Sequence, residues 1–323
     1  MSKYLRKFET EAEYSAATIY RPSVSLISDE MTVIFDPKHD YSKDYFTMVA
    51  LEDGTFSFSG SSTANCLSYS LDSGATWSTP AQKITTSTIS SGNTIMWKGS
   101  GMSPVLYKGI GTFYQSTPRF NVEGNIMSLL FGDNFSGQTD LTGYNNAFVF
   151  LFSSLGYYAK IVNAENLILP ASTMVDSCYD SMFYKCTSLT AAPVLPATTL
   201  AENCYASMFQ GCTSLTTAPE LSATELAVGC YYGVFQGCTS LTTAPVLPAT
   251  TLAEYCYGSM FRGCTNLNSI TCLATDISAT RCTSYWVNGV AANGTFTKAA
   301  SMTSWGTGDA GIPSGWTVQD YTG

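Results

Sequence analysis

Apolar residues return at a fixed spacing in the second half of the chain. Two cysteine series share a period of 26 residues, Cys178, Cys204, Cys230, Cys256 and Cys282 in one and Cys186, Cys212, Cys238 and Cys264 in the other. A period of roughly 20–29 residues is typical of leucine-rich repeats, in which short units stack side by side and bury a common core. The pattern therefore predicts a stacked repeat array.

Each repeat opens with an apolar stripe. When Cys178, Tyr179, Met182, Phe183 and Cys186 are placed at about 100° per residue, they fall on one side of a helical wheel, which predicts a one-sided helix packed on a core. The following segment, residues 189–195, is predicted to be extended and to add one rung to a narrow parallel sheet. The rung should be short, because the prolines near its end have no N–H to donate to the next strand. The predicted core residues are Cys178, Cys186, Cys204, Cys212, Cys230, Cys238, Cys256, Cys264, Met182, Phe183, Met208, Phe209, Phe235, Met260 and Phe261.

The ends of the array diverge from the repeat. Residues 146–177 align in part with the repeats and are expected to form the first cap. Residues 282–290 are expected to form the last, with Trp286 in place of Met260 and Val290 in place of Cys264. The predicted fold is mixed β and α, with a small N-terminal module at 1–40, a β-sandwich-like domain at 41–145, an α/β leucine-rich-repeat solenoid at 146–290 and a closing segment at 291–323.

The repeat cysteines allow three interpretations. Valine at 290 can replace a buried thiol but neither a metal ligand nor half a disulfide, which favours cysteine as a small core residue. Zinc is disfavoured, because the chain has no CxxC pair and one histidine, His39. Disulfides between stacked repeats are the third interpretation. Cys272 aligns with Val246 and Glu220 and is expected nearer the surface, while Cys66 lies outside the array.

The unit F-x-x-C-T-S-L-T, its 26-residue spacing and the tail "GTFTKAASMTSWGTGDAGIPSGWTVQ" resemble the BspA-like, Treponema-type leucine-rich repeats of gut Bacteroidales and their phages. The resemblance covers about residues 146–323. It implies surface-exposed modules for adhesion or recognition.

A second resemblance lies in "KYLRKFETEAEYSAATIYRPSVSLISDEMTVIFDP". It resembles a short N-terminal module on structural proteins of Bacteroides-infecting phages, including crAss-like phages, and implies a docking segment, to which we assign Tyr4, Leu5 and Phe8. From the residues alone, Thr10–Ala17 predicts a helix with a capping box, and Val24, Leu26, Val33 and Phe35 predict a hairpin. The other interpretation is a β-α-β cap of the next domain.

The segment 41–145 contains many short alternating runs separated by Gly, Asn, Ser and Pro, which predicts β structure. Within it, "SLDSGATW" at 70–77 fits the Asp-box of sialidase-type propellers. That box is a structural turn, in which Asp72 accepts bonds from the turn, Gly74 supplies an unusual backbone angle and Trp77 packs beneath. A single copy and five arginines in the whole chain argue against a sialidase.

The composition of the chain argues against several classes of partner and site. The chain has 323 residues, 12% of them charged, and a net charge of −9, which argues against a nucleic-acid partner. The chain contains no stretch of about 18 apolar residues, so no membrane span is predicted. Acidic residues near the start argue against a signal peptide. His39 reads as a surface loop residue, and Tyr179, Tyr205, Tyr231 and Tyr257 as core residues in preference to a sugar-stacking ladder. We expect no catalytic residue, no cofactor and no metal site.

Together, the resemblances imply a non-enzymatic phage virion protein, a head fibre or capsid decoration. It would be made in the bacterial cytoplasm, dock on a capsid or other virion protein through its N-terminus, and display its repeats to host or mucosal glycans or proteins. A homotrimer is expected from other fibre-like virion proteins. The alternatives are a bacterial BspA-type cell-surface adhesin, a tail receptor-binding protein and, on the Asp-box alone, a glycan hydrolase.

Overall fold

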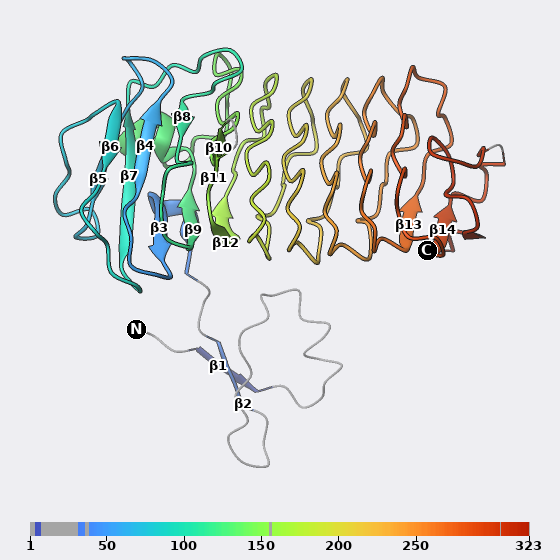
Figure 1. Ribbon diagram of the computed structural model, residues 1–323, viewed down its shortest axis with the longest axis horizontal. Coiled ribbons are helices and arrows are strands. Elements are labelled where there is room, and N and C mark those ends of the chain that lie inside the picture. The colour runs from blue at the N-terminus through green and yellow to red at the C-terminus, as the bar shows by residue number, and fades with distance from the viewer. Residues whose placement is uncertain (1–3, 8–31, 36–38, 155–156, 304, 323) are drawn as a thin grey trace. The chain divides into compact units, whose positions relative to one another are not determined.

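The computed structural model describes residues 4–7, 32–35, 39–154, 157–303 and 305–322 (Figure 1). The chain divides into two compact units, Met1–Asp40 and Tyr41–Gly323. In the first unit, β1 (Tyr4–Lys7) pairs antiparallel with β2 (Thr32–Phe35). Val33 and Phe35 of the expected hairpin therefore lie in a strand. Its partner among the described residues is β1, not the segment with Val24 and Leu26. Phe8, Val24, Leu26 and the expected helix at 10–17 lie outside the described residues.

The second unit begins with a five-stranded sheet in the order β12-β9-β3-β7-β5. Its strands are β3 (Phe46–Ala50), β5 (Cys66–Ser70), β7 (Thr94–Ser100), β9 (Phe120–Asn125) and β12 (Ile161–Ile168). Neighbouring strands are antiparallel except for β9 and β12, which run parallel. This parallel edge faces the repeats.

A three-stranded sheet, in the order β6-β4-β8, packs close to the first. It consists of β4 (Ser57–Gly60), β6 (Lys83–Thr85) and β8 (Gly111–Thr112). The buried ring of Phe113 joins the two sheets, because it lies 5.8 Å from the ring of Phe46 and 5.0 Å from that of Phe58. Buried aromatic rings thus connect the two sheets in this part of the core.

The edge strand β12 is hydrogen-bonded to the first repeat. Thr190 donates its N–H to the carbonyl oxygen of Val162 at 2.8 Å, and Ala164 donates to that of Ala191 at 2.9 Å. Residues 146–152 stack on the first repeat in the same way, with the N–H of Phe148 bonded to the carbonyl oxygen of Cys178 at 2.8 Å. The short pair β10 (Ser153–Ser154) and β11 (Tyr157–Tyr158) follows this segment. The sheet therefore gives the first repeat a backbone edge to bond to.

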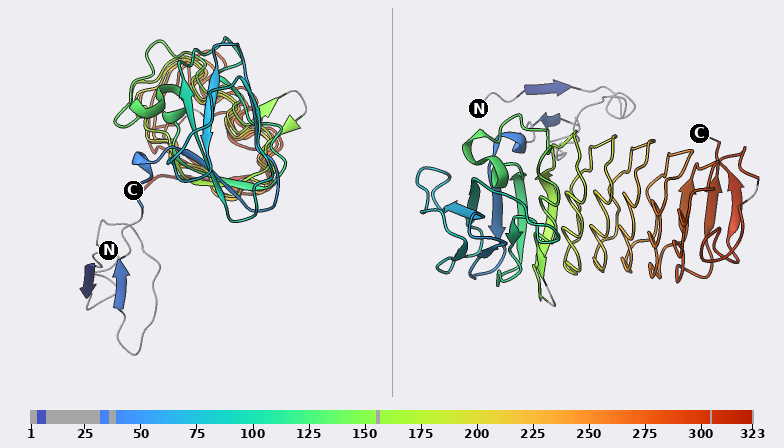
Figure 2. Two further views of the ribbon diagram at one scale, coloured as in Figure 1. Left: turned by 90° about the vertical axis from the view of Figure 1, so that its left-hand side faces the viewer. Right: turned by 90° about the horizontal axis from the view of Figure 1, so that it is seen from above.

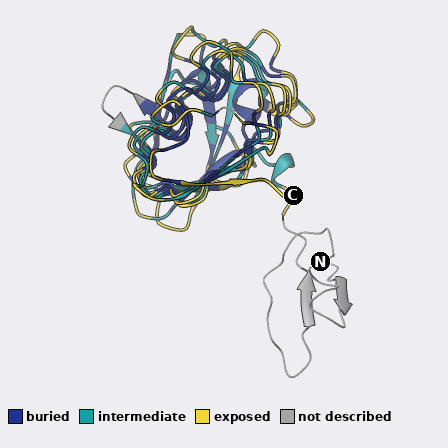
Figure 3. Ribbon diagram, turned by 90° about the vertical axis from the view of Figure 1, so that its right-hand side faces the viewer, coloured by how far each residue is buried: buried dark blue, intermediate teal, exposed yellow. Residues whose placement is uncertain are grey.

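The repeats form a row of backbone coils, and adjacent coils lie side by side in both Figure 1 and Figure 2. We number coils 1 to 5 from Asp176, Glu202, Val228, Glu254 and Thr280, and call them together the coil array. Each coil has both buried and exposed residues along its path (Figure 3). Along the proline-containing side the coils are joined by isolated bridges such as Thr199 to Glu225, so the expected narrow sheet is reduced to single contacts there.

The expected mixed α/β solenoid is wrong. The helices among the described residues are α2 (Ser128–Phe131), η1 (Tyr41–Lys43) and η2 (Gly132–Asn134), and none of these lies in the coil array. The unit is mostly β, and the predicted helix at 178–186 is a run of turns.

The turns alternate two kinds of hydrogen bond. In coil 1, even-numbered residues from Cys178 to Cys186 donate their N–H to the carbonyl oxygen three residues earlier, while odd-numbered residues from Ser177 to Lys185 donate to coil 2. Ser177, Ser181 and Lys185 each have a φ of 55°, the left-handed region, whereas an α-helix needs a φ near −63°. Half of the N–H groups thus join neighbouring coils, which a helix would not allow because it bonds them internally.

We call residues 176–185 of coil 1 and their equivalents in coils 2 to 5 the turn face. Behind it, aromatic rings stack in two columns. Tyr179, Tyr205, Tyr231 and Tyr257 lie 5.7–6.4 Å apart in one column, and Phe183, Phe209, Phe235 and Phe261 lie 5.5–6.0 Å apart in the other. The tyrosine rings are at most 2% exposed, so they belong to the core.

Trp286 closes both columns. Its ring lies 6.5 Å from Tyr257, 6.3 Å from Phe261 and 5.6 Å from Trp305, and its indole N–H donates to the carbonyl oxygen of Gly311 at 2.8 Å. A parallel three-stranded sheet follows, formed by β13 (Ser269–Cys272), β14 (Thr295–Lys298) and β15 (Thr317–Asp320). The segment after 290 therefore continues the stack.

Candidate functional site

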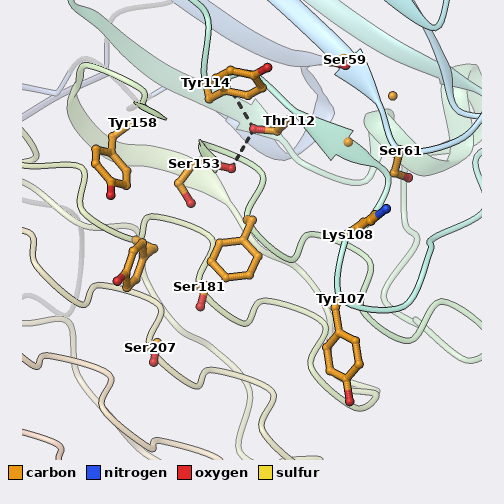
Figure 4. A pocket seen from close by; sticks show the side chains of 14 residues that line it. Ser59, Ser61, Tyr107, Lys108, Thr112, Tyr114, Ser153, Tyr158, Ser181 and Ser207 are labelled. Carbon is orange, nitrogen blue, oxygen red and sulfur yellow. Dashed lines mark hydrogen bonds between the residues drawn. The ribbon is translucent and has the colours of Figure 1, made fainter. Parts of the chain in front are cut away.

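A hollow of about 880 Å³ opens where the coil array meets the β-sheets. Its walls come from β4, the loop before β8, the β10–β11 pair and the turn face of coils 1 and 2 (Figure 4). The lining residues are Ser59, Gly60, Ser61, Tyr107, Lys108, Gly111, Thr112, Tyr114, Phe150, Ser153, Tyr158, Ser181, Tyr184 and Ser207. A volume in the range of about 300–1,000 Å³ suits a small-molecule ligand.

Three aromatic side chains gather on the side formed by the coils. The ring of Tyr184 lies 6.0 Å from Phe150 and 6.1 Å from Tyr158. The ammonium of Lys185 lies 5.4 Å from the ring of Tyr158 and 5.3 Å from that of Tyr184. The phenol of Tyr158, which is bonded to Lys185, raises the pKa of this lysine and favours its charged form.

Hydrogen bonds fix several hydroxyl groups of the hollow. Ser61 donates to the carbonyl oxygen of Gly109 at 2.6 Å, and Thr112 donates to that of Ser153 at 3.1 Å. Ser181 donates to the carboxylate of Asp180 at 2.7 Å, while burial raises the pKa of Asp180 to about 6. Two of these oxygens also accept bonds, Ser61 from the side-chain amide of Asn65 at 2.8 Å and Thr112 from the N–H of Tyr114 at 3.3 Å, so each keeps one free lone pair.

The hollow combines segments that the sequence analysis treated separately or passed over. Tyr107, Phe150, Tyr158 and Tyr184 were not predicted as site residues. Tyr107 is 72% and Phe150 37% exposed, whereas Tyr158 and Tyr184 are half-buried, and no sequence pattern links the four. Phe150 and Tyr107 also have positive φ values of 52° and 59°, uncommon for large residues.

The Asp-box residues form a turn on the sheet edge and do not line the hollow. Asp72 accepts bonds from the N–H and hydroxyl of Thr76 at 2.8 and 2.6 Å, which lower its pKa to about 2. Gly74 has a φ of 87°, and Trp77 lies beneath the ammonium of Lys98 at 4.3 Å. The geometry is that of a structural turn.

The predicted core residues lie inside the coil array. Every one of them is 0% exposed: Cys178, Cys186, Cys204, Cys212, Cys230, Cys238, Cys256, Cys264, Met182, Phe183, Met208, Phe209, Phe235, Met260 and Phe261. All eleven cysteines have free thiols. Cys272, expected nearer the surface, is also 0% exposed, because it lies in β13 where the chain becomes a regular strand.

The remaining predicted positions give no second site. Tyr4 and Leu5 lie in β1, Phe8 lies outside the described residues, and His39 is exposed. Within the described part of the chain, no group of three or more His, Cys, Asp or Glu side chains could hold a metal ion. No helix of the described residues is long and apolar enough to cross a bilayer.

Comparison of the chain with protein-family models, with curated proteins and with solved structures finds no match.

Proposed function

We propose that this protein is a non-enzymatic component of a phage virion, a head fibre or capsid decoration. It docks through residues 1–40 and displays its coil array for adhesion to host or mucosal molecules. The observation that carries the display role is a turn face whose side chains differ from coil to coil over an interior that barely changes.

The turn face varies at defined positions. The position of Asp180 holds Ala206, Tyr232 and Gly258 in coils 2 to 4. The position of Tyr184 holds glutamine in coils 2 and 3 and Arg262 in coil 4. A varied polar and aromatic surface on a rigid support is what recognition requires.

Exposure alone does not explain this variation. One threonine position remains threonine in four coils, at Thr187, Thr213, Thr239 and Thr265, although three of these are exposed and the fourth is half-buried. The position of Tyr184 is half-buried in three coils, yet it holds three residue types over the four coils. Exposed and half-buried positions of the turn face therefore differ between coils, and this variety of side chains is what the display role uses.

The docking role is supported by the N-terminal resemblance and by the division of the chain, since Met1–Asp40 is a compact unit by itself. A short separate segment suits attachment to a particle while the repeats are presented to other molecules. Formation of a homotrimer is part of the proposal and rests on other fibre-like virion proteins.

Immunogold electron microscopy of purified particles tests the location, with an antibody raised against residues 178–264. Gold at regular positions on the capsid is the expected result. Labelled tail tips would replace the head fibre with a tail receptor-binding protein. Clean particles beside labelled bacterial envelopes would replace it with an adhesin.

Deletion of residues 1–40 tests docking. The truncated protein should be missing from particles while its circular dichroism and thermal unfolding show a folded chain. Incorporation at the level of the full chain would contradict docking through this segment.

A further inference from the structure

We propose that the hollow at the base of the coil array binds a short oligosaccharide. The lining pairs five aromatic rings, of Tyr107, Tyr114, Phe150, Tyr158 and Tyr184, with hydroxyl groups from six serine and threonine residues. A sugar ring has the matching chemistry, because its C–H faces are apolar and its edge carries hydroxyl groups. This inference rests on the proposed adhesive function and assigns it a ligand class and a place.

The aromatic rings are placed for stacking on a flat ligand. Figure 4 shows Tyr107, Tyr114 and Tyr158 around a common space, with Ser153 and Ser181 between them. Phe150 keeps an apolar ring 37% exposed in this space, where it has no polar group to hydrate. Water released from such a ring by an apolar sugar face favours binding.

The hydroxyl groups supply directionality. Ser61, Thr112 and Ser181 direct their protons to Gly109, Ser153 and Asp180. Ser61 and Thr112 also accept bonds from Asn65 and Tyr114, so each keeps one of its two lone pairs for a ligand. Sugar hydroxyls donate to such acceptors. Because the protein bonds already fix these oxygens, little side-chain freedom is lost on binding.

The charge of the hollow favours a saccharide over a nucleotide. Among the lining residues that the structure describes, Lys108 is the one with a full charge. A polyphosphate would need several cationic or backbone N–H donors. With the ammonium of Lys185 behind the rings of Tyr158 and Tyr184, the hollow has two cations, which suits a neutral sugar or one with an acidic substituent.

An array of defined neutral and acidic oligosaccharides, probed with the full chain, tests the inference. The oligosaccharide with the strongest signal is then titrated by calorimetry. We expect Tyr184→Ala to weaken its binding at least tenfold and Tyr184→Phe to retain most of it. Tyr232→Ala is the matched control, because Tyr232 is a 39% exposed turn-face tyrosine outside the hollow, and it should change Kd less than twofold.

Thermal unfolding of each variant establishes that it is folded, and Phe150→Ala gives a second loss-of-binding test in case Tyr184→Ala does not fold. Lack of binding to every arrayed saccharide at millimolar concentration would overturn the inference. Equal loss in the Tyr232→Ala control would move the binding site to the open turn face. Neither result affects particle labelling, so the proposed virion location stands or falls separately.

Discussion

At the residue scale, the second cysteine series joins neighbouring coils through its thiols. Cys212, Cys238 and Cys264 donate to the carbonyl oxygens of Phe183, Phe209 and Phe235 at 3.2, 3.1 and 3.0 Å. Burial raises the pKa of these thiols, because a thiolate would lose its hydration there. Such thiols are poor nucleophiles, so they fill space and add a weak bond.

Thiol counting tests this role. Ellman's reagent should find one reactive thiol in the native protein, the half-buried Cys66, because the other ten cysteines are buried. It should find eleven thiols after non-reducing denaturation. Cys66→Ser is the control and should remove the native signal. A total below eleven in denaturant would mean that disulfides join the coils.

Asp180 gives a prediction for pH. Its folded-state pKa of about 6 lies above its ordinary value of 3.8, so between these values the folded protein holds a proton that the unfolded chain has released. Stability from this group is therefore present at about pH 4 and is lost as the pH rises through about 6. Asp180→Asn should raise the free energy of unfolding at neutral pH, by up to about 3 kcal/mol, and leave it nearly unchanged at about pH 4.

Thermal unfolding at the two pH values measures this difference. Asp176→Asn, a change at an exposed turn-face carboxyl, is the control and should have a small effect at both. A similar gain for Asp180→Asn at both pH values would show that burial of its charge is not the cause.

At the element scale, the apolar spacing of the turn segments determines which side chains are buried but not the backbone conformation. Cys178, Met182 and Cys186 recur every four residues, which is close enough to 3.6 to fit a helix as well as a run of four-residue turns. Both structures bury the same side chains, so the core could be predicted. The backbone could not, because it depends on the left-handed residues at positions such as Ser181 and Lys185, which have ordinary side chains.

Replacing a glycine of the turn face by alanine should change the free energy of unfolding in opposite directions for a run of turns and for a helix. Gly237 has a φ of 73°, and a Cβ there would meet no atom closer than 3.7 Å. Gly237→Ala should therefore lower the free energy of unfolding by about 1–2 kcal/mol through backbone strain alone. In a helix the same change would stabilise by about 1 kcal/mol.

Denaturant unfolding monitored by circular dichroism measures the change. Thr242→Ala, at an exposed position of the same coil, should alter stability by no more than about 0.5 kcal/mol. An increase in stability for Gly237→Ala would contradict the turn structure.

The residues that line the hollow could not be predicted from the sequence, for a different reason. Tyr107, Phe150, Tyr158 and Tyr184 come from separate segments that have no common period. Their meeting depends on β12, which docks coil 1 on the sheets, and on the leading segment at 146–152. Such contacts follow from tertiary packing and leave no local pattern.

At the scale of the whole molecule, one hydrophobic core runs from Phe46 to Trp316 without a break. Stacked repeats contact only their neighbours, and long arrays can unfold in parts. Here the sheets close one end of the core and Trp286 with Trp305 closes the other. We expect one calorimetric transition for the residues from Tyr41 onward.

Trp286→Ala tests this coupling. Loss of a fully buried tryptophan should cost about 3–5 kcal/mol. In a cooperative unit the whole transition moves to lower temperature, whereas separate unfolding of the C-terminal coils would give a second, earlier transition. Trp77→Ala, at a half-buried position, should have a smaller effect on the melting temperature.

The bonding between coils also has a genetic consequence. On the turn face each coil offers the next the same set of carbonyl and N–H groups, so an in-frame gain or loss of 26 codons would leave the turn-face bonds between coils with partners. Near-identical copies are substrates for recombination, which can change the number of coils in one step. A gain or loss among coils 3 to 5 would lengthen or shorten the array and keep the walls of the hollow, which come from coils 1 and 2 and the sheets.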